Sequence, residues 1–306
     1  MRVLKFILAA GLLYWLFQGD QLHLERLGDR LFTTGHLWVM LLCCASYLGQ
    51  TLRWWSLLRV QGIEVRFLTL LRLFFIGQFF FLTSLGSVAG ETAKGYYVLG
   101  HVGEARVAGV STVLVDPLLG LGAYFLIGGL ATLFRIATGV ASEVEIWLGS
   151  VLLLILAAMA GGVLLVGSSR VRRMVLARLP ATWRDRLLPV LDAYHPCRGG
   201  MPKVILIALL TSFIYFLAFK MAGHAMDMSV GWDCLFVALP LLMIAFVIPM
   251  PLGSLGVGES AAQLLLQQWG IPNGAMIMLL LRVTKWMLLL PPGLYCYLSE
   301  RGARTG

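Results

Sequence analysis

Two related strings of sequence decide the fold: SLGSVAGETA at residues 84–93 and SLGVGESA at residues 254–261. Both strings contain Ser-Leu-Gly, a short spacer, and then Gly-Glu-Thr/Ser-Ala. Each string follows a long apolar stretch and precedes a short helix-like segment and a further apolar span. Because the surroundings match as well as the letters, we interpret the two strings as copies in an internal repeat.

The composition indicates a membrane protein. Of the 306 residues, 59% are hydrophobic and 13% are charged, whereas charged residues make up about 25% of ordinary soluble domains. A soluble core cannot enclose so much apolar surface, so the composition excludes a soluble globular enzyme. The formal charge of +9 would suggest a nucleic-acid partner in a soluble protein. Here the basic residues cluster in short loops between apolar runs, which indicates topological charge bias and no nucleic-acid binding.

Six apolar stretches are long enough to cross a membrane, since a spanning helix needs roughly 17–25 such residues. They cover residues 3–19, 36–58, 107–134, 146–168, 203–226 and 274–298. The first resembles a signal peptide, but its apolar run continues past any alanine-rich cleavage candidate, so we interpret it as a retained span. Two further apolar stretches, 67–86 and 234–257, each run into a glycine-rich turn and a short helix-like segment, 91–100 and 259–269.

The distribution of charge predicts how these stretches are inserted. The linker 170–202 is rich in arginine and should lie in the cytoplasm. Acidic residues such as Glu143 and Asp227 should lie on the outer side. Both assignments hold only if 67–100 enters and leaves on the cytoplasmic side and 234–270 on the outer side. The sequence therefore predicts an all-α membrane protein with about six full spans, two re-entrant helical hairpins and both termini in the cytoplasm.

Three full spans separate the two strings, so the copies should have opposite orientations. We expect one transmembrane domain over residues 1–306, with repeat one at about 36–168 and repeat two at about 203–299. Inverted repeats with broken helices that meet near the bilayer midplane are typical of transporters. Unwound backbone is tolerated at that depth only inside protein or beside a wet cavity. The predicted hairpin turns contain Gly86, Gly90, Gly253, Gly256 and Gly258, although a tight turn before an ordinary helix start explains these glycines equally well.

The chain resembles the lysylphosphatidylglycerol synthase transmembrane-region family of flippase-like membrane proteins. The first matching stretch has Arg72, Gly77 and the string Gly-Glu-x-x-Lys at 90–94, where the family usually ends in Arg. The second stretch is closer to the family: it reads PMPLGSLGVGES at 249–260 and is followed by Arg282 in the last span. The resemblance implies movement of a lipid with an anionic headgroup across the bilayer.

The sequence also departs from the family pattern. Residues 80–84 replace the Asn and Pro that usually precede the glycines of the first hairpin, and Asp116-Pro117 replaces a Glu-Arg pair in the next span. These changes leave the identity of the headgroup open. No acyltransferase-like synthase domain follows Arg304. The resemblance therefore implies the stand-alone lipid-moving part and not the lipid-aminoacylating enzyme.

Charged residues within or beside the apolar stretches are the candidates for a substrate site, because ionisable groups at bilayer depth are costly and usually serve a function. Basic groups could neutralise a phosphate, and acidic groups could pair with them in the empty site or carry protons that drive exchange. The predicted substrate-binding residues are Arg72, Glu91, Lys94, Asp116, Glu259, Ser260, Arg282 and Lys285. Neutralising Arg282 or Glu259 should abolish lipid transfer without unfolding the protein.

A structural interpretation of these charges stays open. They could form ion pairs that hold the repeats together, such as Asp116 with Arg282 or Lys285. Arg53 and Arg72 could instead extend to the cytoplasmic face of the membrane. No metal-site spacing and no nucleotide- or dinucleotide-binding motif occurs, so we expect no metal and no cofactor.

We expect a transporter and not an enzyme. It would be a flippase-like protein that moves an anionic phospholipid or a polyprenyl-phosphate-linked glycan across the bacterial cytoplasmic (inner) membrane. One alternative is an integral-membrane lipid-modifying transferase that uses Glu91, Lys94 or Asp116 for acid–base chemistry. Another is a membrane partner subunit of a glycosyltransferase. The arginine-rich linker is predicted to lie on the cytoplasmic leaflet as an amphipathic helix or to dock such an enzyme.

Overall fold

The computed structural model describes residues 24–84, 86–167, 199–247 and 250–305, together with Gly11 and Met174. Within these residues the protein is entirely helical, so the prediction of an all-α fold is confirmed. The first predicted span, 3–19, apart from Gly11, and most of the predicted linker 170–202 lie outside the described residues.

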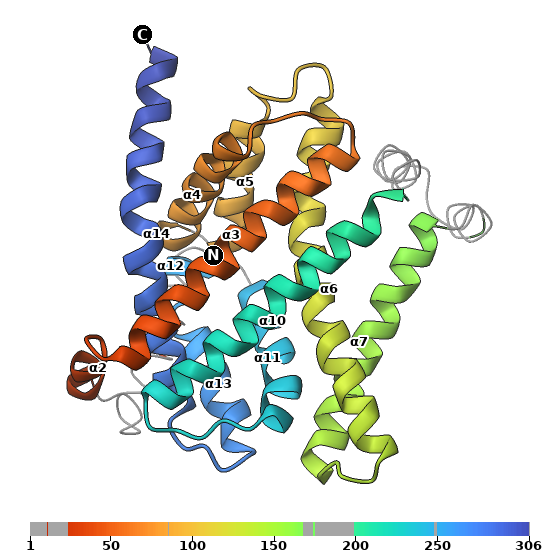
Figure 1. Ribbon diagram of the computed structural model, residues 1–306, viewed down its shortest axis with the longest axis vertical. Coiled ribbons are helices and arrows are strands. Elements are labelled where there is room, and N and C mark those ends of the chain that lie inside the picture. Colours follow the sequence, from red (N-terminus) through yellow and green to blue (C-terminus); the bar gives the residue numbers. More distant parts are fainter. Residues whose placement is uncertain are drawn as a thin grey trace.

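The helices follow the apolar pattern closely (Figure 1). In chain order they are α2 (Leu24–Arg30), α3 (Thr34–Val60), α4 (Phe67–Thr83), α5 (Gly86–Val98), α6 (Arg106–Ala137), α7 (Glu143–Gly167), α10 (Met201–Ala225), α11 (Trp232–Val247), α12 (Pro251–Ser254), α13 (Val257–Gln267) and α14 (Gly274–Thr305). Five helices, α3, α6, α7, α10 and α14, cover five of the predicted spans. Among the described helices, α6, α10 and α14 are long and apolar enough to cross a membrane, whereas the apolar α4 and α11 are shorter.

Two helical hairpins occupy the remaining apolar stretches. Helix α4 turns back into α5, and α11 turns back through α12 into α13 (Figure 1). The hairpin α4–α5 opens at one end of the long axis and α11–α13 at the other, and their tips meet between the two ends. The backbone N–H of Leu252 donates a hydrogen bond of 3.0 Å to the carbonyl oxygen of Ser84. The hairpin tips that contain the two repeated strings are therefore in direct contact.

The glycine that ends Ser-Leu-Gly has a positive φ in both strings. Gly86 has a φ of 58° and Gly256 a φ of 84°, a region that favours glycine because it has no Cβ. Each of the two lies at the start of its hairpin's second helix. A Cβ on Gly86 would also lie 2.9 Å from the carbonyl oxygen of Met250 in the other tip. Glycine is thus needed here for the turn and for the contact between the tips.

The other predicted turn glycines divide into two groups. Gly253 has a φ of 67° and lies in α12 between two further left-handed residues, Leu252 (φ 52°) and Ser254 (φ 64°). Gly90 and Gly258 lie inside α5 and α13 instead of at the turns. A Cβ on Gly90 would lie 2.9 Å from the carbonyl oxygen of Gly77, so that glycine allows the two arms of the first hairpin to pack closely.

The two halves of the chain pack against each other through equivalent helices. Helix α3 lies along α10, while α4 packs against α14 and α11 packs against α6. Each of the last two contacts depends on a glycine of the long helix: Gly293 of α14 lies against the carbonyl oxygen of Phe75, and Gly128 of α6 lies against that of Phe236. Close backbone approach at small residues is typical of helix packing in membranes. The first arm of each hairpin therefore rests on the long helix of the other half of the chain.

Candidate functional site

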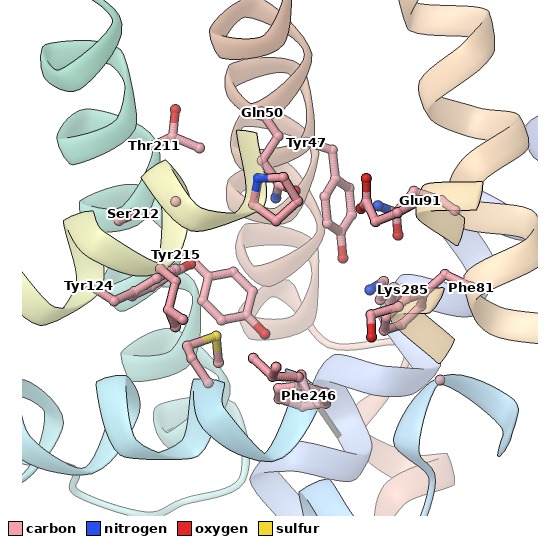
Figure 2. A pocket seen from close by; sticks show the side chains of 18 of the residues that line it. Tyr47, Gln50, Phe81, Glu91, Tyr124, Thr211, Ser212, Tyr215, Phe246 and Lys285 are labelled. Carbon is pink, nitrogen blue, oxygen red and sulfur yellow. The ribbon is translucent and has the colours of Figure 1, made fainter. Parts of the chain in front are cut away.

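A cavity of about 420 Å³ lies at the meeting point of the two hairpin tips. Its walls come from both hairpins and from α3, α6, α10 and α14, and Figure 2 shows side chains from these elements around the common space. Its volume falls within the range of roughly 300–1,000 Å³ that is usual for small-molecule sites. We therefore take this cavity as the candidate site.

The first charged pair at the cavity joins α3 to α6. The Arg53 guanidinium donates from Nε to Oδ1 of Asp116 at 2.6 Å and from Nη2 to Oδ2 at 3.0 Å. Both residues are buried. The space for the guanidinium comes from Gly120, where a Cβ would lie 2.5 Å from Arg53 Nη1.

This pair corrects two interpretations from the sequence. The ion-pair partner of Asp116 is Arg53 and not Arg282 or Lys285. Arg53 also does not extend to the membrane surface, because Asp116 holds its guanidinium in the interior. This bidentate pairing is the geometry in which arginine binds a carboxylate most strongly.

The second charged pair fixes the tip of the second hairpin to α14. Arg282 donates from Nε and from Nη2 to the two carboxylate oxygens of Glu259, the latter at 3.1 Å. Arg282 also donates to the carbonyl oxygens of Leu252, Gly253 and Ser254, at 3.3, 2.9 and 3.1 Å. Arg282 therefore satisfies the carbonyl groups of the left-handed segment.

Glu259 also stabilises the start of α13. Its Oε2 accepts a hydrogen bond of 2.8 Å from the backbone N–H of Gly256. This is the carboxylate half of a capping box, and a negative charge at a helix N-terminus is favourable. Glu259 is completely enclosed and does not line the cavity, whereas Arg282 does.

The third charged pair lies within the first hairpin. Lys94 Nζ is 2.7 Å from Glu91 Oε2, one helical turn away on α5. The Lys94 stem packs against Gly77 of α4, and its ammonium lies 5.6 Å from the centre of the Trp54 ring. Glu91 lines the cavity and keeps 27% of its side chain exposed.

Lys285 differs from the other basic groups at the cavity. It projects from α14 into the cavity wall, and its ammonium lies 4.0 Å from the centre of the Phe81 ring. Within the described part of the chain it has neither a carboxylate partner nor a hydrogen bond. The cluster of seven charged residues has four basic members (Arg53, Lys94, Arg282 and Lys285) and three acidic members (Glu91, Asp116 and Glu259), which leaves one positive charge.

The predicted site residues are therefore brought together with two exceptions. Glu91, Arg282 and Lys285 line the cavity, and Lys94, Asp116 and Glu259 each pair with a residue that lines it. Arg72 is exposed on α4 and does not line the cavity. Ser260 is buried in α13 and does not line the cavity, and its hydroxyl has no hydrogen-bond partner among the described residues.

Sequence reasoning missed the uncharged polar wall of the cavity. Tyr47 and Gln50 come from α3, Tyr124 from α6, and Ser212 and Tyr215 from α10. The signal was present: Tyr47, Gln50 and Arg53 follow one another at intervals of three residues, which places them along one side of α3. A polar stripe in an apolar span indicates a wall that faces protein or water and not lipid.

The rim of the cavity is apolar and exposed. Leu114 and Leu118 of α6 are 61% and 57% exposed, and Val247 of α11 is 56% exposed, yet all three line the cavity. The cavity therefore reaches the side of the molecule beside α6. In a bilayer such a rim would face the lipid chains.

Comparison with known proteins gives one family. The family model described as lysylphosphatidylglycerol synthase TM region matches residues 2–293, which is nearly the whole chain. No curated protein and no solved structure matches.

Proposed function

The chain belongs to the lysylphosphatidylglycerol synthase transmembrane-region family, and on that premise we propose that it moves a lipid with an anionic, phosphate-bearing headgroup across the membrane. Family membership and the apolar helices make it a membrane protein related to lipid handling. The proposed passenger is a phospholipid or a polyprenyl-phosphate-linked glycan.

The observation that carries the proposal is the uncompensated charge of Lys285. A half-buried ammonium without a counter-charge is unfavourable, so the cavity favours an anion. Lys285 lines the cavity, and a phosphate beside its ammonium would gain a charge-assisted hydrogen bond. The three acidic residues do not oppose this, because each is already paired with a basic residue.

The two hairpins support a passage that can open to either side. Helices α4 and α11 have 17 and 16 residues, hence lengths of about 25 Å, which is less than the hydrocarbon core of about 30 Å. We propose that both hairpins are re-entrant, that the halves from α3 to α7 and from α10 to α14 form an inverted repeat, and that 3–19 adds a sixth span. Rocking of one half against the other would then expose the cavity alternately.

The exposed apolar rim supports a lipid as the passenger. A headgroup in the cavity would remain covalently joined to acyl or prenyl chains that cannot enter a polar space. The gap beside Leu114, Leu118 and Val247 would let these chains stay in the bilayer while the headgroup crosses. We propose the cytoplasmic membrane as the location, with the end that holds the C-terminus and the α3–α4 connection in the cytoplasm (Figure 1).

The same geometry argues against a transferase. A general acid or base must reach the substrate proton that it transfers. Asp116 is held by two hydrogen bonds from Arg53, and Glu91 and Lys94 are paired with each other. The candidate acid–base groups are therefore occupied with partners inside the protein.

Lipid transfer in vesicles tests the proposal. Purified protein in proteoliposomes should move fluorescent phosphatidylglycerol between leaflets, and Lys285→Met should reduce the rate at least tenfold. Lys203→Gln, which removes a positive charge from an exposed position on α10, should keep the wild-type rate. An unchanged transfer rate in Lys285→Met would refute the proposal. A covalently changed lipid in the mass spectrum would support a transferase instead.

A further inference from the structure

The second helix of each hairpin and the long helix after it repeat at a constant distance along the chain. The two Gly-Glu pairs, at 90–91 and 258–259, are 168 residues apart. Helices α6 and α14 have 32 residues each and start at Arg106 and Gly274, which is again a distance of 168 residues. Each residue of α5 and α6 from Gly90 onward therefore has an equivalent in α13 or α14. The interface between α5 and α6 can thus be compared with that between α13 and α14.

The interface between α13 and α14 is closed by two contacts. Arg282 of α14 donates hydrogen bonds to both carboxylate oxygens of Glu259 on α13. Nearer the start of α14, Gly274 lies against the carbonyl oxygen of Ala262, where a Cβ would lie 2.6 Å from that oxygen. An ion pair and a direct backbone contact therefore hold these two helices together.

The ion pair has no counterpart between α5 and α6. Leu114 occupies the position equivalent to Arg282, and Glu91 occupies the position equivalent to Glu259. A leucine cannot pair with a carboxylate, and Glu91 pairs with Lys94 on its own helix instead. The first repeat has thus kept the acidic half of this ion pair and lost the basic half.

The close backbone contact has no counterpart either. Arg106 occupies the position equivalent to Gly274. Its Cβ excludes the approach that Gly274 makes to the carbonyl oxygen of Ala262. Small residues are what allow membrane helices to approach this closely. The sequence of the first repeat therefore cannot close its interface in the way that the second repeat does.

The cavity opens at this unlatched interface. Ser87 and Glu91 of α5 line it from one side, and the exposed Leu114 and Leu118 of α6 line it from the other. In Figure 2 Glu91 and Tyr124 of α6 lie on opposite flanks of the space. We call the gap bordered by Ser87, Glu91, Leu114 and Leu118 the lateral portal.

The chemistry of the lateral portal suits a lipid that enters sideways. Its α6 edge is apolar, as the acyl or prenyl chains require, and its α5 edge is polar, as the headgroup requires. We infer that the lipid enters and leaves the cavity between α5 and α6, beside the N-terminal half of α6. The pair of Arg282 with Glu259 keeps the equivalent route between α13 and α14 closed in this structure. The inference rests on the proposed function, because it assumes that the passenger is a lipid.

An added ion pair tests the lateral portal. Leu114→Arg places an arginine at the position equivalent to Arg282, so it should pair with Glu91 and hold α5 to α6. Lipid transfer in proteoliposomes should fall at least about tenfold, the factor by which one charge-assisted hydrogen bond would lower the open fraction. Leu130→Arg is the matched control, since Leu130 is 56% exposed near the other end of α6 and does not line the cavity. It should keep the wild-type rate.

The effect of the new arginine should depend on its carboxylate partner. In a Glu91→Gln background, adding Leu114→Arg should change the transfer rate little, because the charged acceptor is gone. The Tm of Leu114→Arg should not fall below that of the wild type, since the new pair joins two helices. An equal fall in rate with and without Glu91 would overturn the latch.

A reversible cross-link tests the lateral portal in folded protein, whatever the stability of Leu114→Arg. Ser87→Cys and Leu118→Cys are combined in a background whose five native cysteines are replaced by alanine. Bridging the pair with a cleavable bifunctional thiol reagent should stop transfer, and reduction should restore it. Each single-cysteine variant, treated in the same way, should keep its own rate. Undiminished transfer through the cross-linked protein would overturn the inference.

The failure of this inference is distinguishable from the failure of the proposed function. Transfer that still depends on Lys285 but is unaffected by the cross-link would overturn the lateral portal alone. An equal decrease of the rate in Leu114→Arg and Leu130→Arg would also count against the lateral portal alone. Absence of transfer in the wild type, or transfer independent of Lys285, would refute the proposed function itself.

Discussion

The backbone of Leu252 donates a 3.0 Å hydrogen bond to the carbonyl oxygen of Ser84, and this bond joins the tips of the two hairpins. Leu252 has a left-handed conformation, which costs of order 1–3 kcal/mol in a residue other than glycine. Arg282 stabilises that conformation through the carbonyl groups of the same segment. The junction between the tips is thus strained and held by the same arginine that faces the cavity.

Gly86→Ala should destabilise this junction. The substitution places a Cβ in a left-handed residue and 2.9 Å from the carbonyl oxygen of Met250, so we expect a loss of at least about 1–2 kcal/mol. Gly95→Ala is the control on the same helix, because a Cβ there meets nothing within 4 Å. Thermal unfolding in detergent should show a lower Tm for Gly86→Ala and none of that loss for Gly95→Ala.

Glu259→Gln should lower stability as well as transfer. It leaves Arg282 buried without its counter-charge, and breaking such a pair costs about 3–5 kcal/mol. The sequence alone suggested loss of transfer without unfolding, but burial of the pair changes that expectation. The Tm should fall for Glu259→Gln and stay unchanged for the exposed Glu64→Gln. An unchanged Tm for Glu259→Gln would show that the pair does not hold the tip.

Gly120→Ala should disturb the pair between Arg53 and Asp116. The added Cβ would lie 2.5 Å from Arg53 Nη1, so the guanidinium must move, and we expect a severalfold lower transfer rate. Gly122→Ala is the matched control on α6, because its Cβ would meet only the flexible end of Met159. Equal rates for the two variants would mean that the position of Arg53 does not matter.

Leu118→Trp should slow transfer by narrowing the apolar rim. Leu118 lines the cavity and is 57% exposed, so a larger side chain there would obstruct the proposed path of the lipid chains. Leu133→Trp makes the same change on α6 at an exposed residue that does not line the cavity. Initial transfer rates should fall severalfold for the first variant only. An equal decrease of the transfer rate in both variants would show that the effect does not come from the rim of the cavity.

The sequence predicted the elements of this fold better than the partners within it. Apolar length located the helices, and the Ser-Leu-Gly strings located the hairpin tips, because both depend on local properties of the chain. The pairing of Arg53 with Asp116 was not predictable in the same way. It depends on how α3 and α6 are rotated and on the space left by Gly120, and only the packed structure determines these.

The cavity wall illustrates the same limit. Charged residues could be predicted as site candidates from the sequence because burying them is costly. Six of the eight predicted residues do lie at or beside the cavity. The tyrosines and glutamines carry no charge, so each one alone resembles an ordinary core residue. They can be recognised as part of a site only in the folded structure, where α3, α6 and α10 bring Tyr47, Tyr124 and Tyr215 into one wall of the cavity.

The lipid that remains bound after purification gives the most direct test of a phosphate at Lys285. Mass spectrometry of the protein in mild detergent should find a phosphate-bearing lipid at near one per chain in the wild type and in Lys203→Gln. The same lipid should be lost from Lys285→Met while that variant keeps its folded yield. Equal retention by Lys285→Met, or a bound lipid without a phosphate, would contradict the account.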